Sequence, residues 1–582
     1  MGKIASLIRN ILAKLFISAR RFPQPLFCAL LTVTTMIIQI HSDNTAQAFR
    51  DVLTKAAMTF ALGIPLALSL NLFFERFPAS RRAKLLAYGI AAAGLALYYL
   101  MLPPKINANT TSRYLAINLA LYLLTIFLPY FYRRANFERY VVRLLSGFAT
   151  TYLYSIILYI GLTAILFTLN KLFGLNWPRL YIDLWVLVVG IFAPAYFLAD
   201  VPEYNREIEA DYYPKLLQVL LLYIVMPLIL VYTAILYVYF AKIVLTRTWP
   251  VGIVANLVVW YAFISIIVIF LTFPLRNNNV WCQKFSAVFP RFVPPLLVMM
   301  FLAMAIRIQA YGVTENRYFV LAGGIWTTAS FIYFLLSRRS QNIVLPISLA
   351  IVAILTVTGP WSSYAVSKFS QNHRLTSILT KYGMLEGRSI VQPRQELPLA
   401  TKREIGSILW YFKENHRLKD VRLLPANFEI KDMDRVFGFK YESDPSGRFG
   451  NQYFDYSFLE NRVQSIDAYQ YLLDLTGLYH REYQDLRLKQ QTLIFNYTRD
   501  HQLTLQRQGK ILYTKDLNKL ATMLIKREHP KIRDVKSLTY EEQSAHVAVR
   551  YIFKTLRGNE DIATGTLNFN DIDYYLLVKV TP

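Results

Sequence analysis

The stretch from Leu216 to Ala241, LLQVLLLYIVMPLILVYTAILYVYFA, contains 26 residues and no charged side chain. A helix that crosses about 30 Å of hydrocarbon needs about 20 apolar residues, so this stretch is long enough to span a membrane with some tilt. Pro227 lies near its middle, where it removes one backbone donor and predicts a kink. We therefore expect a fold built from membrane-spanning helices.

Ten further apolar stretches are bounded by charged residues, proline or asparagine. Together with the first they give the predicted spans 24–40, 52–74, 84–102, 114–132, 146–169, 180–199, 216–241, 252–275, 292–310, 318–337 and 343–360. The first and the last of these are short for a full crossing. The pattern predicts an α-helical polytopic membrane domain of about 11 transmembrane helices over residues 24–362.

The composition of the whole chain agrees with a membrane protein. Over 582 residues, 55% of the side chains are hydrophobic and 17% are charged, which is too apolar for a soluble protein with an ordinary surface. The two cysteines, Cys28 and Cys282, lie in or beside predicted spans. A disulfide framework in the C-terminal part is therefore excluded.

The net charge of +26 would suggest a nucleic-acid partner in a soluble protein. In this chain, however, one set of alternate loops carries 20 lysines and arginines and the opposite set carries 10. Because basic residues accumulate on the cytoplasmic side of membrane proteins, the N-terminus is predicted to be cytoplasmic. With an odd number of spans, the C-terminal part is then extracytoplasmic, and no nucleic-acid partner is expected.

Residues 1–23 combine five basic residues with an apolar stripe at helical spacing. This pattern is typical of a basic amphipathic cytoplasmic segment that lies on anionic inner-leaflet lipids. The alternative interpretation is an ordinary positively charged flank of the first span.

Beyond Trp361 the composition becomes polar. Residues 363–400 are predicted to form an interfacial helix and a linker, and residues 401–582 an extracytoplasmic α+β domain. Periodicity predicts helices over 401–416 and 515–528, and strands over 453–459, 491–497, 503–506, 547–556 and 567–580. This domain is long enough to bury a core of its own.

Signatures of the common catalytic sites are missing from the sequence. There is no Walker loop, no nucleophile elbow and no His-Glu-x-x-His motif, and the seven histidines do not have metal-ligand spacing. We therefore expect no metal and no cofactor.

The densest group of polar residues beside a span is RIQAYGVTENRY, from Arg307 to Tyr318. Arg307 lies about one turn inside the predicted membrane edge, where a cation must snorkel, pair or face a polar cavity. One interpretation is an anion-binding or gating element; the other is a tight hairpin held by an ion pair between Glu315 and Arg307 or Arg317. The candidate binding or gating residues are Arg307, Tyr311, Gly312, Thr314, Glu315 and Arg317, together with Asp183 in the sixth span.

Three strings of this sequence carry a family resemblance. They are Arg307-Ile308-x-x-Tyr311-Gly312-x-Thr314-x-x-Arg317-Tyr318, then Gly359-Pro360-Trp361-Ser362, then Ser370-Gln371-x-x-Arg374-Leu375, and Val436-Phe437-Gly438-Phe439 looks like a further element. The chain resembles the bacterial membrane proteins called domain of unknown function 4153. The resemblance implies a multi-pass protein of the bacterial inner membrane, and it supplies no catalytic residues.

Two classes of function agree with this layout. The first is a non-enzymatic transport or cell-envelope component whose external domain binds an envelope polymer or a protein partner. The alternative is a membrane-embedded glycosyltransferase that uses a lipid-linked donor, because such enzymes have a similar arrangement of spans and external domain. Their chemistry needs a carboxylate in the first external loop, where this chain has Asp43 and Asp51.

Overall fold

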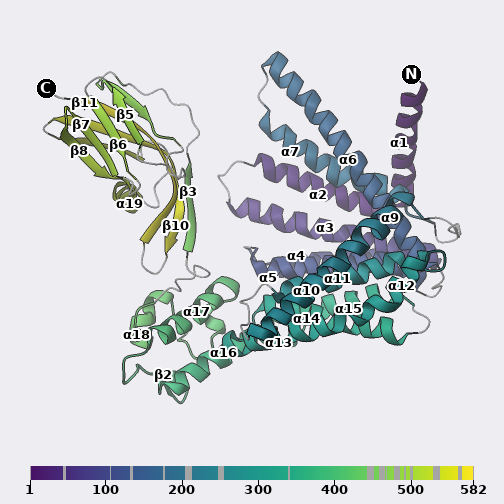
Figure 1. Cartoon of the computed structure of the whole chain (residues 1–582). Helices are drawn as coiled ribbons and strands as arrows, with labels where there is room; N and C mark the ends of the chain where they lie inside the picture. The colour runs from purple at the N-terminus through teal and green to yellow at the C-terminus, as the bar shows by residue number, and fades with distance from the viewer. Residues whose placement is uncertain are drawn as a thin grey trace. The chain divides into compact units, whose positions relative to one another are not determined.

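A computed structural model of the chain divides into two compact units, Met1–Arg374 and Leu375–Pro582 (Figure 1). The structure describes residues 2–580 apart from 43–46, 105, 132–135, 175–176, 204–212, 247–253, 338–340, 426, 442–450, 458–465, 467, 477–485, 491–492, 499–501, 529–537, 545 and 562–565. The two units are described separately below.

All the secondary structure in the described residues of the first unit is helical. Its helices are α1 (Gly2–Arg21), α2 (Pro23–His41), α3 (Gln47–Arg76), α4 (Arg81–Met101), α5 (Ala108–Phe127), α6 (Phe137–Phe173), α7 (Pro178–Leu187), α8 (Ala193–Ala199), α9 (Lys215–Val219), α10 (Met226–Thr246), α11 (Val254–Thr272), α12 (Val280–Val288), α13 (Val293–Tyr311), α14 (Glu315–Leu336), α15 (Val344–Val357) and α16 (Ser363–Lys381). Wider π-helical turns at Val188–Phe192 and Leu220–Val225 join α7 to α8 and α9 to α10.

Ten helical segments in the described part of the chain are long and apolar enough to cross a membrane, which confirms the multi-span prediction. The eleventh predicted stretch forms α15, a helix of 14 residues. At about 1.5 Å per residue, α15 alone is shorter than the hydrocarbon core. The chain nevertheless returns along α14, because the hydroxyl of Tyr318 near the start of α14 donates to the carbonyl of Trp361 beyond α15, at 2.6 Å.

Burial differs strongly among the spans. Helix α11 is apolar on all sides, and Val258 and Ala262 in it are completely buried against residues of α13 such as Leu296. A helix without a polar face suits a membrane span: one side of α11 packs into the bundle, while Leu257, Trp260 and Ile264 on the other side are 45%, 65% and 48% exposed. By contrast, α4 has no buried residue, so it is a peripheral span.

Helix α1 runs in a different direction from the α2 that follows it (Figure 1). Its apolar side chains Leu12 and Phe16 are 60% and 70% exposed, whereas Lys14 and Arg21 contact other parts of the first unit. Apolar residues outside and charged residues inside suit a helix at a membrane surface. Binding of α1 to anionic lipids stays a prediction.

The second unit contains two hydrophobic cores. The first is formed by the end of α16, α17 (Leu399–Asn415) and α18 (Met433–Phe437), with Leu379, Leu409 and Phe437 completely buried. A small hairpin, β1 (Leu385–Glu386) with β2 (Ser389–Ile390), precedes α17.

The other core lies between two antiparallel sheets and α19 (Leu517–Glu528). One sheet has the order β3-β10-β11-β4, with β9 also paired to β10, and the other has the order β5-β6-β7-β8. The strands are β3 (Asn451–Ser457), β4 (Tyr471–Asp474), β5 (Leu486–Gln490), β6 (Leu493–Tyr497), β7 (Gln502–Arg507), β8 (Lys510–Asp516), β9 (Thr539–Gln543), β10 (Val547–Asp561) and β11 (Thr566–Val580). The predicted α+β class is therefore confirmed.

Candidate functional site at the turn between α13 and α14

The turn begins at Gly312, which ends α13 with φ +68° and ψ 179°. This combination of angles is essentially restricted to glycine, since a side chain would collide with the backbone. Thr314 is extended, and Glu315 opens α14, where a carboxylate interacts favourably with the helix dipole. The sequence therefore reverses direction between the two spans within three residues.

One face of α16 packs against this turn. Ser363, Ser367 and Gln371 follow one another at intervals of four and are 0%, 0% and 2% exposed. The backbone N–H of Val313 donates to Ser370 Oγ at 2.8 Å. Gln371 Nε2 donates to the carbonyls of Tyr311 and Val313 at 3.0 and 3.1 Å. The polar face of α16 thus satisfies backbone groups that the turn leaves outside a helix.

Charged side chains complete the same cluster. Arg317 donates to the carbonyls of Gly312 and Tyr311 at 2.6 and 3.2 Å, and Arg374 donates to the carbonyl of Tyr311 at 3.3 Å. Both guanidinium groups lie over the ring of Tyr311, at 5.5 and 5.9 Å from its centre. Glu315 Oε1 accepts a hydrogen bond of 2.8 Å from Ser367. These contacts fix the first half of α16 against α13 and α14.

The structure brings together the three strings that carry the family resemblance. The bond from Tyr318 to Trp361 adds the string 359–362 to the turn, and Ser370, Gln371 and Arg374 supply the third. Sequence analysis did not predict that α16 contacts the turn, because it relied on the apolar residues of this helix and not on its polar ones. The four-residue spacing of Ser363, Ser367 and Gln371 was the available signal.

The structure places most of the predicted binding and gating residues in this cluster, but not all of them. Tyr311, Gly312, Glu315 and Arg317 all lie in the cluster, Thr314 precedes α14, and Arg307 is half-buried in the last turns of α13. The bonds of Arg317 to backbone carbonyls indicate that this side chain stabilises the turn. Binding of an anion at this turn stays a prediction.

Asp183, the other predicted candidate, is 7% exposed in α7. Its Oδ2 lies 3.4 Å from Nε2 of His41, at the end of α2. Its second oxygen is buried and has no hydrogen-bond partner in the described part of the chain. A buried carboxylate with one open acceptor can bind a cation or a hydroxyl group. Of the two other candidate acids, Asp51 lies in α3, and Asp43 lies outside the described residues.

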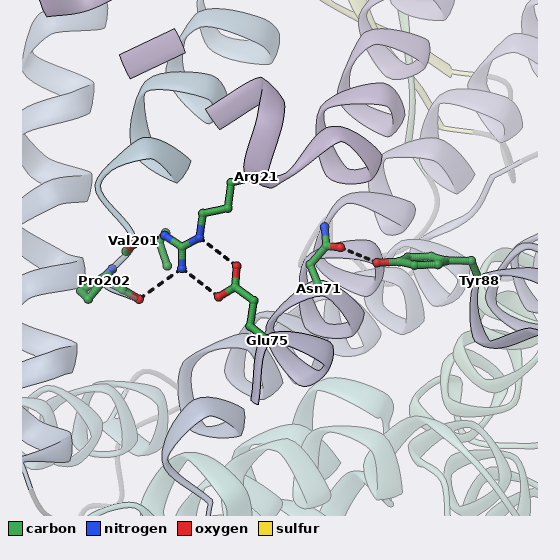
Figure 2. A network of polar contacts seen from close by, with 6 residues as sticks. All are labelled: Arg21, Asn71, Glu75, Tyr88, Val201 and Pro202. Atoms are coloured by element: carbon green, nitrogen blue, oxygen red, sulfur yellow. Dashed lines mark hydrogen bonds and ion pairs between the residues drawn. The ribbon is translucent and has the colours of Figure 1, made fainter. Parts of the chain in front are cut away.

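A second polar network lies at the ends of α1 and α3 (Figure 2). Arg21 forms two bonds of 2.8 Å with the carboxylate of Glu75 and also donates to the carbonyls of Val201 and Pro202. This two-pronged geometry is the strong form of an arginine–carboxylate pair. The network joins the end of α1 to α3 and to the residues after α8.

Lys14 extends this network along α1. Its Nζ lies 2.6 Å from Oδ2 of Asp200 and 3.3 Å from the hydroxyl of Tyr196. Burial works against the charged form of Lys14, but the bonds with Asp200 and Tyr196 outweigh it and raise its pKa above the usual value. The sequence predicted the basic residues of α1, but it did not predict the partners of Lys14, which lie more than 180 residues away.

The described residues contain no group of three or more histidine, cysteine, aspartate or glutamate side chains that could hold a metal ion.

Comparison with known proteins shows which family the chain belongs to. The chain is 24% identical over 201 residues to the uncharacterized protein PM1469 of Pasteurella multocida (strain Pm70), and this match covers 34% of each chain. No solved structure matches the chain. Residues 26–388 match the family described as Domain of unknown function (DUF4153), and they include the turn and all of α16. The chain belongs to this family of proteins of unknown function.

Proposed function

We propose that this multi-pass membrane protein is a non-enzymatic component of the cell envelope, which presents residues 401–582 to an envelope polymer or protein partner outside the cytoplasm. The observation that carries the proposal is the cluster around Gln371. There, Ser370 and Gln371 of α16 bond to the backbone of the turn and hold the helix through which the chain continues into the second unit.

Two further observations support the proposal. The second unit has hydrophobic cores of its own, as a domain that works in water requires. The two-to-one distribution of basic residues between alternate loops favours a cytoplasmic N-terminus and an external C-terminal domain. The hydrogen bond from Tyr318 to Trp361 places the chain after α15 beside the start of α14, which agrees with an odd number of crossings.

Reporter fusions test the orientation. Alkaline phosphatase folds only outside the cytoplasm, so a fusion after Pro582 should be active and a fusion after Ser337, at the end of α14, should be inactive. The reverse pattern would overturn the proposal, because the partner-binding unit would then face the cytoplasm.

In-cell crosslinking tests the presentation of a partner. A photoreactive residue at Ile511 or Leu472, which are 59% and 55% exposed, should yield an adduct with an envelope polymer or protein. The matched control is Leu12 in α1, which is 60% exposed and is expected on the cytoplasmic side. If positions 511 and 472 give no adduct beyond that of position 12, the external unit has no partner.

The enzyme alternative is favoured by one observation, the buried and half-partnered carboxylate of Asp183 beside His41. A glycosyltransferase with a lipid-linked donor would use such an acid as a base or metal ligand at the membrane edge. The test is turnover of a polyprenyl-phosphate sugar by the purified protein and by the variants D183N, D43A and D51A. Turnover that D183N abolishes would favour the enzyme over the envelope component.

A further inference from the structure

An apolar groove of about 990 Å³ runs between α2, α3 and α4. Its wall on α4 includes three small residues, Ala91, Ala92 and Ala96. Its floor is narrow, since a Cβ atom at Gly63 would lie 2.9 Å from Cys28 Sγ and 3.3 Å from Leu95 Cδ1. Phe27 and Leu100 on its rim are 60% and 75% exposed. The groove is therefore open toward the surface that the spans present to lipid.

The groove runs along the first half of α2, the middle of α3 and the last two thirds of α4. Gln24 at the start of α2 and Tyr88, two turns into α4, line one end of it, and Tyr99 and Leu100 near the end of α4 line the other part. A groove that is apolar along a span and open to the bilayer suits an acyl chain, which offers the same dispersion contacts as the neighbouring side chains.

Gln24 and Tyr88 line one end of the groove, and Asn71 bonds to Tyr88. The hydroxyl of Tyr88 donates to Oδ1 of Asn71, which leaves Nδ2 of Asn71 buried without a partner in the described structure (Figure 2). Oε1 of Gln24 is likewise buried and unpaired within the described residues. An unpaired buried polar atom is costly, so a rotation of either amide toward a ligand that offers an acceptor or a donor would be favourable.

Basic residues gather at the helix ends beyond the Tyr88 end of the groove, outside the residues that line it. Arg81, Arg82 and Lys84 occupy the first turn of α4, and Arg20, Arg21 and Arg76 lie at the ends of α1 and α3. Glu75, which precedes Arg76, is paired with Arg21. The surplus of cations complements a negatively charged headgroup.

We propose that this groove binds one anionic glycerophospholipid, with an acyl chain along α4 and the headgroup against Asn71, Gln24 and the first turn of α4. The phosphate accepts from Nδ2 of Asn71 and is neutralised by Arg81 and Arg82. A headgroup hydroxyl, as in phosphatidylglycerol, donates to Oε1 of Gln24. This site is independent of the proposed function, since it involves neither the turn nor the second unit.

The experiment uses the full-length protein, purified in a mild detergent and examined by native mass spectrometry. The wild type should carry one anionic phospholipid. After delipidation it should bind phosphatidylglycerol in preference to phosphatidylcholine. The variant A92F fills the groove and should lose the lipid, whereas A93F, which adds the same ring at a neighbouring position outside the groove, should keep it.

Variants at the Tyr88 end test the headgroup. The double variant R81Q/R82Q should bind phosphatidylglycerol about thirty-fold more weakly, since each basic residue near an anionic lipid contributes about 1 kcal/mol. It should bind phosphatidylcholine as the wild type does. N71L should also weaken phosphatidylglycerol binding, and thermal unfolding in detergent shows whether each variant is folded.

Three results would overturn the proposal. One is a wild-type protein that neither retains nor rebinds a phospholipid. Another is equal lipid binding by folded A92F and A93F. The third is a dimer that A92F, but not A93F, dissociates, because the groove would then be a contact between two copies of the chain.

Discussion

The turn between α13 and α14 and the Tyr88 end of the α2–α4 groove both have side-chain amides near the ends of spans, but these amides differ in pairing. At the turn, Gln371 donates two hydrogen bonds and is 2% exposed. At the groove, Gln24 and Asn71 each keep one buried atom without a partner in the described structure. A paired amide stabilises one arrangement of the backbone, whereas an unpaired amide contributes little to stability and is available to a ligand.

The largest effect is expected from Gly312→Ala. The angles of Gly312 cost a residue with a side chain about 1–3 kcal/mol. The added Cβ atom would also lie 2.9 Å from Nε2 of Gln371 and 3.1 Å from Oγ of Ser370, so it would push α16 away from the turn. Thermal unfolding of the detergent-solubilised protein should show a clear loss of stability.

The matched control is Gly161→Ala in α6, where a Cβ atom would meet nothing within 4 Å. This change should leave stability unchanged or raise it slightly, because alanine favours a helix more than glycine does. If G312A is as stable as G161A, the turn does not hold α16 and the paired side of the comparison is wrong.

A smaller effect is expected from replacing an amide by leucine in each region. Gln371→Leu removes the side-chain bond to the carbonyl of Val313 and one of the three side-chain bonds to the carbonyl of Tyr311, and it should cost about 1–3 kcal/mol of unfolding free energy. In delipidated protein, Asn71→Leu removes an amide with an unpaired atom and a single bond to Tyr88, so its cost should be well below that of Q371L. Equal losses of stability in the two variants would remove the distinction between the regions.

The sequence was sufficient to predict the class of fold and the place of the turn. Runs such as 216–241 are long, apolar and uncharged, and this property depends on no distant contact. The strands β10 and β11 were equally visible, since their side chains alternate over long stretches. Elements with weak local signals, such as β4 and β9, were not predicted; they form by pairing with the longer strands β11 and β10.

The candidate site was predicted in part. Tyr311, Gly312 and Arg317 were selected from their position at a span end, and they do lie in one cluster. Their partners Ser370 and Gln371 are more than 50 residues away, and only the folded return of α15 brings them there. The groove could not be predicted, because it depends on how three spans pack and on the small residues that α4 presents to α2 and α3.

The smallest effect is expected from a paired cluster in the second unit. Glu542 on β9 accepts from Lys515 Nζ at 2.7 Å and from the hydroxyl of Tyr513 at 2.6 Å, and thus joins the two sheets. Burial works against the charged form of Glu542, but these bonds outweigh it and hold its pKa below the usual 4.5. Burial likewise opposes the charge of Lys515, yet the bond with Glu542 raises its pKa above the usual 10.5.

The pH dependence follows from these directions. The contribution of Glu542 is complete above about pH 4.5 and is lost as the pH falls through its lowered pKa, while that of Lys515 is lost only above about pH 10.5. Because both side chains are partly exposed, Glu542→Gln should cost about 1 kcal/mol or less near neutral pH. The deficit in thermal stability relative to wild type should shrink below pH 4.

The matched control is Glu541→Gln, which changes the neighbouring, 55% exposed partner of Arg550 and should have no comparable effect. A deficit of E542Q that is constant from pH 3 to pH 7 would show that the ionised pair contributes nothing beyond its neutral hydrogen bonds.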